Sequence, residues 1–136
     1  MSNKCTIYAE MHMVFDNDFD VYSITKKLGI TPTECKMRNE TRISPLTNKN
    51  NEGFWTIRTE EFKECDIKIV LDELIKKIIN KLSEIKKICN ENSGIVIFDI
   101  VPYFHRKSTP SLYFDRDFLN IVNYLNATIH VDLYVD

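Results

Sequence analysis

The sequence predicts an α+β fold in which helices cover one face of a mostly antiparallel sheet. Apolar and polar residues alternate in the first and last strand candidates, as they do in strands with one buried face. Elsewhere, apolar residues recur at three- and four-residue steps, which is typical of amphipathic helices. The resulting order is strand, helix, strand, strand, helix, strand, helix, strand. Its first six elements match the ferredoxin-like βαββαβ unit, and the C-terminal helix and strand would extend the sheet to five strands.

The N-terminal half contains three strand candidates and one helix. Residues 5–14 alternate between a polar face and an apolar face, and the apolar face consists of Cys5, Ile7, Ala9, Met11 and Met13. A short helix is expected over residues 20–28, because Gly29 can supply the left-handed residue that ends a helix. Short strands are then expected around residues 34–38 and 54–57.

The C-terminal half alternates between helices and strands. Residues 67–89 form the longest amphipathic pattern, which predicts a helix with a possible break near Asn80. The apolar run 95–101 is suited to a central strand. A helix over 115–125 and an alternating last strand over 128–135 complete the order.

Composition places limits on the class of protein. The chain has 136 residues, of which 43% are hydrophobic, so we expect a single domain over residues 1–136 that buries its own core. A net charge of −2, with acidic and basic residues interspersed, argues against attraction to nucleic acid or to an anionic membrane. The N-terminus lacks the apolar stretch of a signal peptide, and no run is long enough to cross a bilayer, so a cytoplasmic location is expected.

The cysteines and glycines argue against common cofactor sites. The four cysteines stand far apart without a Cys-x-x-Cys pair, which predicts free thiols and no structural zinc. The three glycines are isolated, so no glycine-rich loop can surround a phosphate. Hydrolase, zinc-protease and deaminase motifs are also missing from the sequence. We therefore expect no cofactor and no catalytic residue, although catalytic groups that converge from distant positions would leave no motif.

Three short motifs occur together in this chain. They are the turn Leu28–Glu34, Trp55 at the start of a strand, and the closing Asp132-Leu133-Tyr134 segment. In this combination the chain resembles the bacterial family called domain of unknown function 4279, over roughly Thr6 to Tyr134. The resemblance implies no activity, cofactor or catalytic residue.

Histidines and carboxylates suggest one candidate site on the sheet. Glu10 and His12 share the polar face of the first strand, and His130 and Asp132 share the polar face of the last. If these strands lie on either side of the strand that carries Asp99, the side chains would meet on one surface. Such nitrogen and oxygen ligands suit a borderline divalent metal, whereas an ordinary solvated sheet face would show the same alternation.

A second candidate site is the segment 39–53 and its flanks. Loops of this length are uncommon unless they bind something or are disordered. Arg38, Arg42 and Arg58 lie near the two ends of this segment and Trp55 follows it, and arginine and tryptophan are the residue types that anchor protein interfaces. The competing interpretation, which we favour for Trp55 itself, is a core or half-core residue that packs beneath a helix.

These observations favour a non-catalytic binding module. The leading interpretation is a small inhibitor-like or immunity-like protein that acts through a protein partner at Arg42, Trp55 and Arg58. The alternative is a protein that binds a metal or small ligand, or an enzyme of unrecognised type, which uses Glu10, His12, His130 and Asp132 on the polar face of the sheet.

Overall fold

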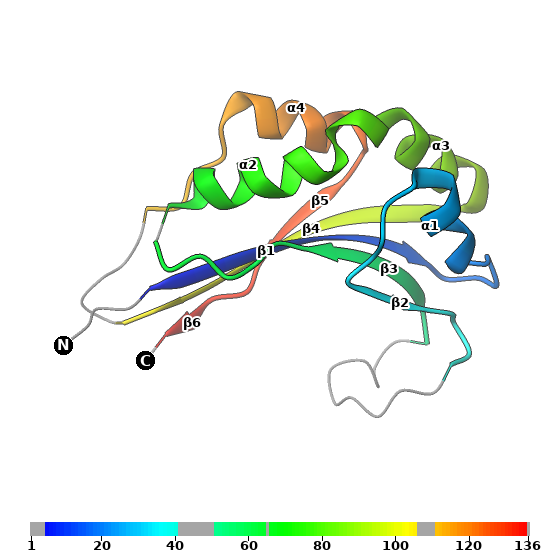
Figure 1. Cartoon of the computed structure of the whole chain (residues 1–136), viewed down its shortest axis with the longest axis horizontal. Helices are drawn as coiled ribbons and strands as arrows, with labels where there is room; N and C mark the ends of the chain where they lie inside the picture. The colour runs from blue at the N-terminus through cyan, green and yellow to red at the C-terminus, as the bar shows by residue number, and fades with distance from the viewer. Residues whose placement is uncertain (1–4, 41–50, 65, 106–110, 136) are drawn as a thin grey trace.

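The structure is a computed structural model that describes residues 5–40, 51–64, 66–105 and 111–135. Within these ranges the chain forms one mixed sheet with helices on a single face (Figure 1). The predicted α+β class and the predicted placement of the helices are therefore confirmed.

Four antiparallel strands make up most of the sheet. They lie side by side in the order β2 (Glu34–Lys36), β3 (Gly53–Arg58), β1 (Thr6–Phe15) and β4 (Gly94–Phe104). The central strand β1 pairs with β4 along its whole length, and its second half also pairs with β3. The middle of the sheet is thus the place where polar side chains from three strands can meet.

The C-terminal edge of the sheet differs from the single strand expected over residues 128–135. This segment forms two short strands, β5 (Thr128–Val131) and β6 (Tyr134–Val135), and both run parallel to β4. The ladder is interrupted at Asp132 and Leu133, although the Asp132 N–H still donates to the Ile100 carbonyl at 2.9 Å. The sheet is mixed because the chain crosses over through a helix between β4 and β5, and such a crossover returns the chain in the parallel direction.

The helices have the predicted positions. They are α1 (Tyr22–Leu28), α2 (Ile67–Ile78), α3 (Leu82–Asn92) and α4 (Arg116–Tyr124), and the break expected near Asn80 is the 3₁₀ turn η1 (Ile79–Lys81). Gly29 adopts a φ of 67° at the end of α1, which is the left-handed conformation that the sequence predicted. The Asp115 carboxylate caps α4 by accepting from the Phe118 N–H at 2.9 Å.

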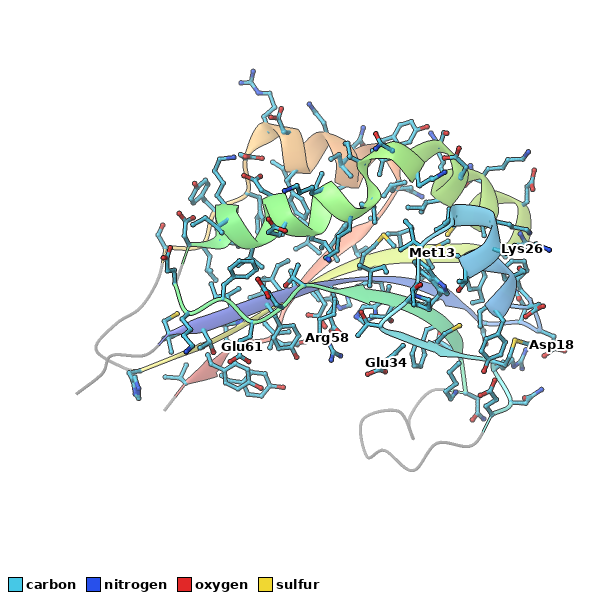
Figure 2. All side chains as sticks on the ribbon, viewed as in Figure 1. Met13, Asp18, Lys26, Glu34, Arg58 and Glu61 are labelled. Atoms are coloured by element: carbon cyan, nitrogen blue, oxygen red, sulfur yellow. The ribbon has the colours of Figure 1, made fainter. Side chains whose placement is uncertain are left out.

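The core lies between the sheet and the helices. The predicted apolar face of the first strand is fully confirmed, because Cys5, Ile7, Ala9, Met11 and Met13 are all buried. Figure 2 shows Met13 on the side of the sheet that the helices cover, whereas Glu34 and Arg58 lie on the opposite side. The alternation that buries one face therefore leaves a second face of the sheet without helices.

The cysteines follow the prediction only in part. Cys89 is a free thiol, and burial raises its pKa to about 12. Cys5 is disulfide-bonded, so the expectation of free thiols is wrong there; distance along the chain does not report distance in space. Cys65 lies outside the described residues.

None of the helices in the described ranges is both long enough and apolar enough to cross a bilayer.

Candidate functional site

The face of the sheet that the helices leave open carries a groove. Its volume is about 540 Å³, which lies within the range of about 300–1,000 Å³ that is common for small-molecule sites. Alternate residues of three strands supply its floor, because side chains two residues apart on a strand point to the same face. The lining residues are Tyr8, Glu10, His12, Val14, Glu34, Glu52, Phe54, Thr56, Arg58, Ile95, Ile97, Asp99, Val101, Asp132 and Tyr134.

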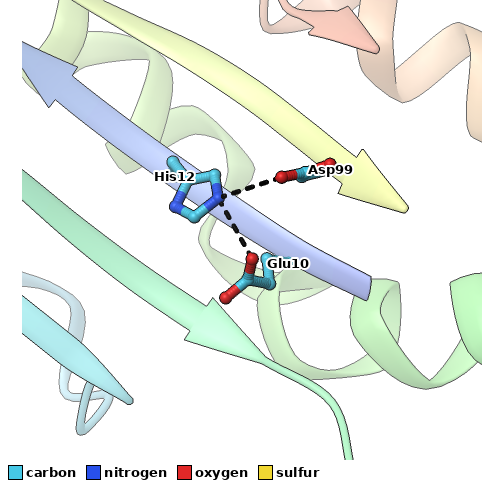
Figure 3. Close-up of side chains that lie close together, drawn as sticks. All are labelled: Glu10, His12 and Asp99. Atoms are coloured by element: carbon cyan, nitrogen blue, oxygen red, sulfur yellow. Dashed lines mark ion pairs between the residues drawn. The ribbon is translucent and has the colours of Figure 1, made fainter. Parts of the chain in front are cut away.

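At the centre of the groove, His12 lies between two carboxylates (Figure 3). Its Nε2 atom is 3.4 Å from Glu10 Oε1 and 3.9 Å from Asp99 Oδ2. Glu10 and Asp99 are direct partners in the β1–β4 register, and His12 is two residues beyond Glu10 on the same face. The pairing of β1 with β4 therefore assembles this cluster.

A second cation fixes Glu10 from the other side. The Arg58 Nε and Nη2 atoms lie 2.7 and 2.6 Å from Glu10 Oε2, and Arg58 is the register partner of Glu10 on β3. Burial disfavours the charge of Glu10, but His12 and Arg58 outweigh this effect and hold the pKa of Glu10 below its ordinary value. Glu10 is only 6% exposed, so this pairing is what allows a carboxylate to remain charged there.

His12 is held as an imidazolium. Burial of the ring opposes the charge, but the carboxylates of Asp99 and Glu10 raise the pKa of His12 to about 9. Its other ring nitrogen, Nδ1, lies 2.7 Å from the Thr56 hydroxyl on β3. With both nitrogens protonated, Nδ1 donates to that hydroxyl, so the orientation of the ring is fixed on both sides.

Asp99 and Asp132 form an acidic pair beside the cluster. Burial raises the pKa of Asp99, but the hydrogen bond and the positive charge of His12 oppose this effect, and the pKa lies below its ordinary value. The contact with Asp99 raises the pKa of Asp132 in turn, as expected when two carboxyl groups share a site. Asp99 Oδ1 is buried and accepts no hydrogen bond from the described residues.

The structure brings together part of the predicted metal set. Glu10 and His12 do lie together, and with Asp99 they place one ligand atom each within 4.8 Å of one another. Asp132 lines the groove beside Asp99. His130 is the register partner of Asp99, but it is exposed and lies outside both the groove lining and the three-residue cluster.

The predicted partner-binding residues have three different positions. Trp55 is 0% exposed, and its indole N–H donates to the Thr25 hydroxyl at 3.0 Å, so it offers no surface to a partner. Arg58 lines the groove instead of flanking a separate loop. Arg42 lies outside the described residues.

The sequence did not indicate that Tyr8, Arg58 and Tyr134 line one groove. Tyr8 lies beneath Arg58, whose guanidinium carbon is 5.3 Å from the centre of the Tyr8 ring, and Tyr134 reaches the groove from β6. The two-residue spacing of Tyr8, Glu10 and His12 is the signal that could have identified Tyr8. No comparable signal pairs Arg58 with Glu10, because that contact depends on which strands are neighbours.

A smaller hollow of about 230 Å³ lies on the helical side of the protein, between α2 and α4. Its main charged groups are already paired, since Lys68 Nζ is 3.2 Å from both Asp72 and Asp115. This hollow therefore offers fewer unpaired charged groups to a ligand than the groove does.

Fold and groove together define a class of protein: an α+β protein that has a ligand-sized, charged groove on the uncovered face of its sheet. Comparison with known proteins adds the family. The chain belongs to the family described as "Domain of unknown function (DUF4279)", whose model matches residues 5–136, so the resemblance seen in the sequence is confirmed. No curated protein and no solved structure matches the chain.

Proposed function

We propose that this protein is a non-catalytic binding module that holds a small ligand in the groove on the open face of its sheet. The observation that carries the proposal is the coincidence of the groove with the paired charges of Glu10, His12, Asp99 and Arg58. Ligand sites typically combine apolar walls with a few convergent polar groups, and this groove has both.

The rigidity of the strands supports the proposal. Glu10, His12 and Asp99 stand on the two longest strands, at positions that are fixed by the β1–β4 ladder. Sites built on strands hold their geometry more precisely than sites on loops. The groove thus needs little reorganisation before it binds.

Native mass spectrometry of protein recovered gently from its own host, before any chelator is added, tests the proposal. We expect a small additional mass that is lost from the variant Arg58→Gln, because this variant releases Glu10 and reshapes the groove. The matched control Arg116→Gln changes an exposed arginine on α4, remote from the groove, and should keep the additional mass. Recovery of the bare chain alone would contradict the proposal.

A metal site is a second candidate, favoured by the cluster of Glu10, His12 and Asp99. Zinc ligands lie about 2.0–2.2 Å from the ion, so ligand atoms 3.4 and 3.9 Å apart need only a small adjustment. Hydrogen bonds from Thr56 to the far nitrogen of His12 and from Arg58 to Glu10 would orient these two ligands. A metal would have to displace the proton of His12, so Zn²⁺ affinity measured by calorimetry should rise between pH 7 and pH 9, and it should be lost in His12→Gln.

The protein-partner interpretation stays a prediction. Of its three residues, only Arg58 lies on an exposed part of the described structure, and its guanidinium is already paired with Glu10 and Glu34. An inhibitor-like or immunity-like role, a bacterial origin and a cytoplasmic location likewise stay predictions from the sequence.

We also propose that the first four strands and the helices between them form a ferredoxin-like βαββαβ arrangement. The strand order β2-β3-β1-β4 with antiparallel neighbours, and helices that follow β1 and β3, support it.

A further inference from the structure

The charges that line the groove do not balance. Among the described residues that line it, two cationic side chains, His12 and Arg58, face five carboxylates, which are Glu10, Glu34, Glu52, Asp99 and Asp132. Both cations are already engaged: His12 lies between Glu10 and Asp99, and Arg58 pairs with Glu10 and Glu34. The remaining charge is therefore negative and lies toward Asp99 and Asp132.

Lys36 does not cancel this excess. Its Nζ atom donates to the backbone carbonyl of Glu52 at 3.2 Å and lies 5.9 Å from the centre of the Phe54 ring. This places the ammonium of Lys36 on the β2 side of the groove, whereas Asp99 and Asp132 lie on the β4 side. The two ends of the groove thus differ in charge.

Asp99 provides an acceptor without a donor. Its Oδ2 atom faces His12, but its buried Oδ1 atom accepts no hydrogen bond from the described residues. A buried acceptor without a donor is costly, because it has lost its water without a replacement. The neighbouring carboxyl of Asp132 adds like-charge repulsion unless a proton or a cation lies between the two groups. A bound donor that carries a positive charge would remove both costs at once.

Apolar side chains flank this acceptor. Ile97 and Ile95 lie two and four residues before Asp99 on the same face of β4, and both line the groove, where Ile95 is exposed. On the other side of Asp99, the rings of Tyr103 and Tyr134 stack with their centres 4.6 Å apart, at the end of the groove that β6 borders. A bare metal ion would leave Ile95 and Ile97 uncovered, whereas a hydrocarbon chain would cover them.

We infer that the groove takes a small organic ammonium compound, whose charged end lies between Asp99 and Asp132 and whose hydrocarbon part lies on Ile97 and Ile95. An ammonium group has three donors and no acceptor, which suits two facing carboxylates. The inference rests on the proposed function and adds the chemical class of the ligand.

Three probes with the same six-carbon chain test the inference: hexylammonium, 1-hexanol and heptanoate. Each is titrated into the ¹⁵N-labelled full chain while amide shifts are followed by NMR. We expect hexylammonium to shift amides of β4 and β5 around Asp99 and to saturate, and the other two probes to bind at least about tenfold more weakly, because a charge-assisted hydrogen bond contributes more than about 1.4 kcal/mol. The variant Asp99→Asn should lose about the same factor, and the control Asp72→Asn, which removes an exposed carboxylate on α2, should not.

The outcomes separate this inference from the proposed function. If 1-hexanol or heptanoate binds in the groove as tightly as hexylammonium, the ammonium inference is wrong and the ligand groove stands. If hexylammonium shifts only amides outside the groove, or binds Asp99→Asn unchanged, the inference is also wrong. If none of the probes binds and native mass spectrometry gives the bare chain, both proposals fail. The NMR spectrum of each variant also shows whether it is folded.

Discussion

His12 carries its charge because two carboxylates from neighbouring strands outweigh the burial of its ring. The same contacts make Glu10 and Asp99 stronger acids than usual. In the unfolded chain these three groups separate and regain ordinary pKa values. The cluster should therefore make the stability of the protein depend on pH.

The direction of this dependence follows from the pKa of His12, which rises from 6.5 to about 9 on folding. Below about pH 6.5 the full contribution of the imidazolium is present, and it is lost as the pH rises through about 9. We expect the free energy of unfolding to fall by up to about 3 kcal/mol across this window, and the variant His12→Gln to lose this slope. On the acid side, the contributions of Glu10 and Asp99 are lost as the pH falls through their lowered pKa values.

Urea unfolding at a series of pH values from 6 to 10 measures this dependence. The control His130→Gln changes an exposed histidine outside the cluster and should keep the slope of the wild type. A slope between pH 6.5 and 9 that persists in His12→Gln would show that other groups cause it.

For individual residues, the sequence predicts which side chains of one strand share a face better than it predicts contacts between side chains of different strands. Two-residue spacing correctly indicates that Glu10 and His12 share a face, since the side-chain period of a strand is two. It cannot indicate that Arg58 meets Glu10 or that Thr56 meets His12, because both contacts depend on the register between β1 and β3. The same spacing predicted His130 and Asp132 as a pair, but the ladder breaks at Asp132 and only Asp132 lines the groove.

At the scale of elements, the helices and the strands differ in how well their limits were predicted. The helices α2 and α3 agree with the predicted apolar pattern and break, because every turn of a surface helix repeats the same signal. The limits of the strands agree less well with the prediction. β4 extends to Phe104, beyond the predicted end at Val101, and the last strand divides into β5 and β6. Strand limits depend on the neighbouring strand, which periodicity along the chain does not report.

The contact between Phe15 on β1 and Gly94 on β4 offers a test of how closely these two strands pack. Phe15 and Gly94 are register partners at the ends of these strands, and a Cβ atom at position 94 would lie 2.4 Å from Cε1 of the Phe15 ring. The ring is fully buried and packs on Phe19 with the ring centres 4.7 Å apart, so it has little room to move. We expect Gly94→Ala to destabilise the protein by about 2–3 kcal/mol through overpacking.

The matched control is Gly29→Ala. Gly29 has a φ of +67°, but apart from its chain neighbours no described residue comes within 4 Å of the added methyl group, so this change costs only backbone strain, about 1 kcal/mol. Thermal unfolding followed by circular dichroism gives both values. An equal or larger loss in Gly29→Ala would contradict the packing of Phe15 against β4.

At the scale of the whole molecule, the strands of the sheet differ in how much of the fold packs against them. The helices cover one face and leave the other to the groove, and β1 lies between two strands whereas β6 pairs with β4 through only two residues. The side chains of β6 are exposed, while alternate side chains of β1 are buried in the core. Local stability should therefore decrease from the centre of the sheet toward β6.

Hydrogen exchange followed by NMR tests this gradient. We expect the amides of Ala9 and Met11 to exchange only when the whole protein unfolds, and those of Tyr134 and Val135 to exchange through local opening and hence far earlier. Exchange of the Ala9 amide as fast as that of Tyr134 would contradict the central position of β1.

The α+β class could be predicted from the sequence because burial on one face imposes a period on each element. The register between the strands could not, and neither could the parallel direction of β5 and β6, since both depend on contacts between residues far apart in the chain. The groove depends on that register, so its full set of lining residues required the three-dimensional structure.

The burial of Trp55 also determines what the intrinsic fluorescence of this protein can report. Trp55 is the single tryptophan of the chain, and it lies on the helical side of β3, whereas its neighbours Phe54 and Thr56 line the groove. Its emission should therefore report the loss of the core on unfolding and stay almost unchanged when a ligand enters. Occupancy of the groove would be followed better through Tyr8 and Tyr134, whose rings lie at the surface that a ligand would cover.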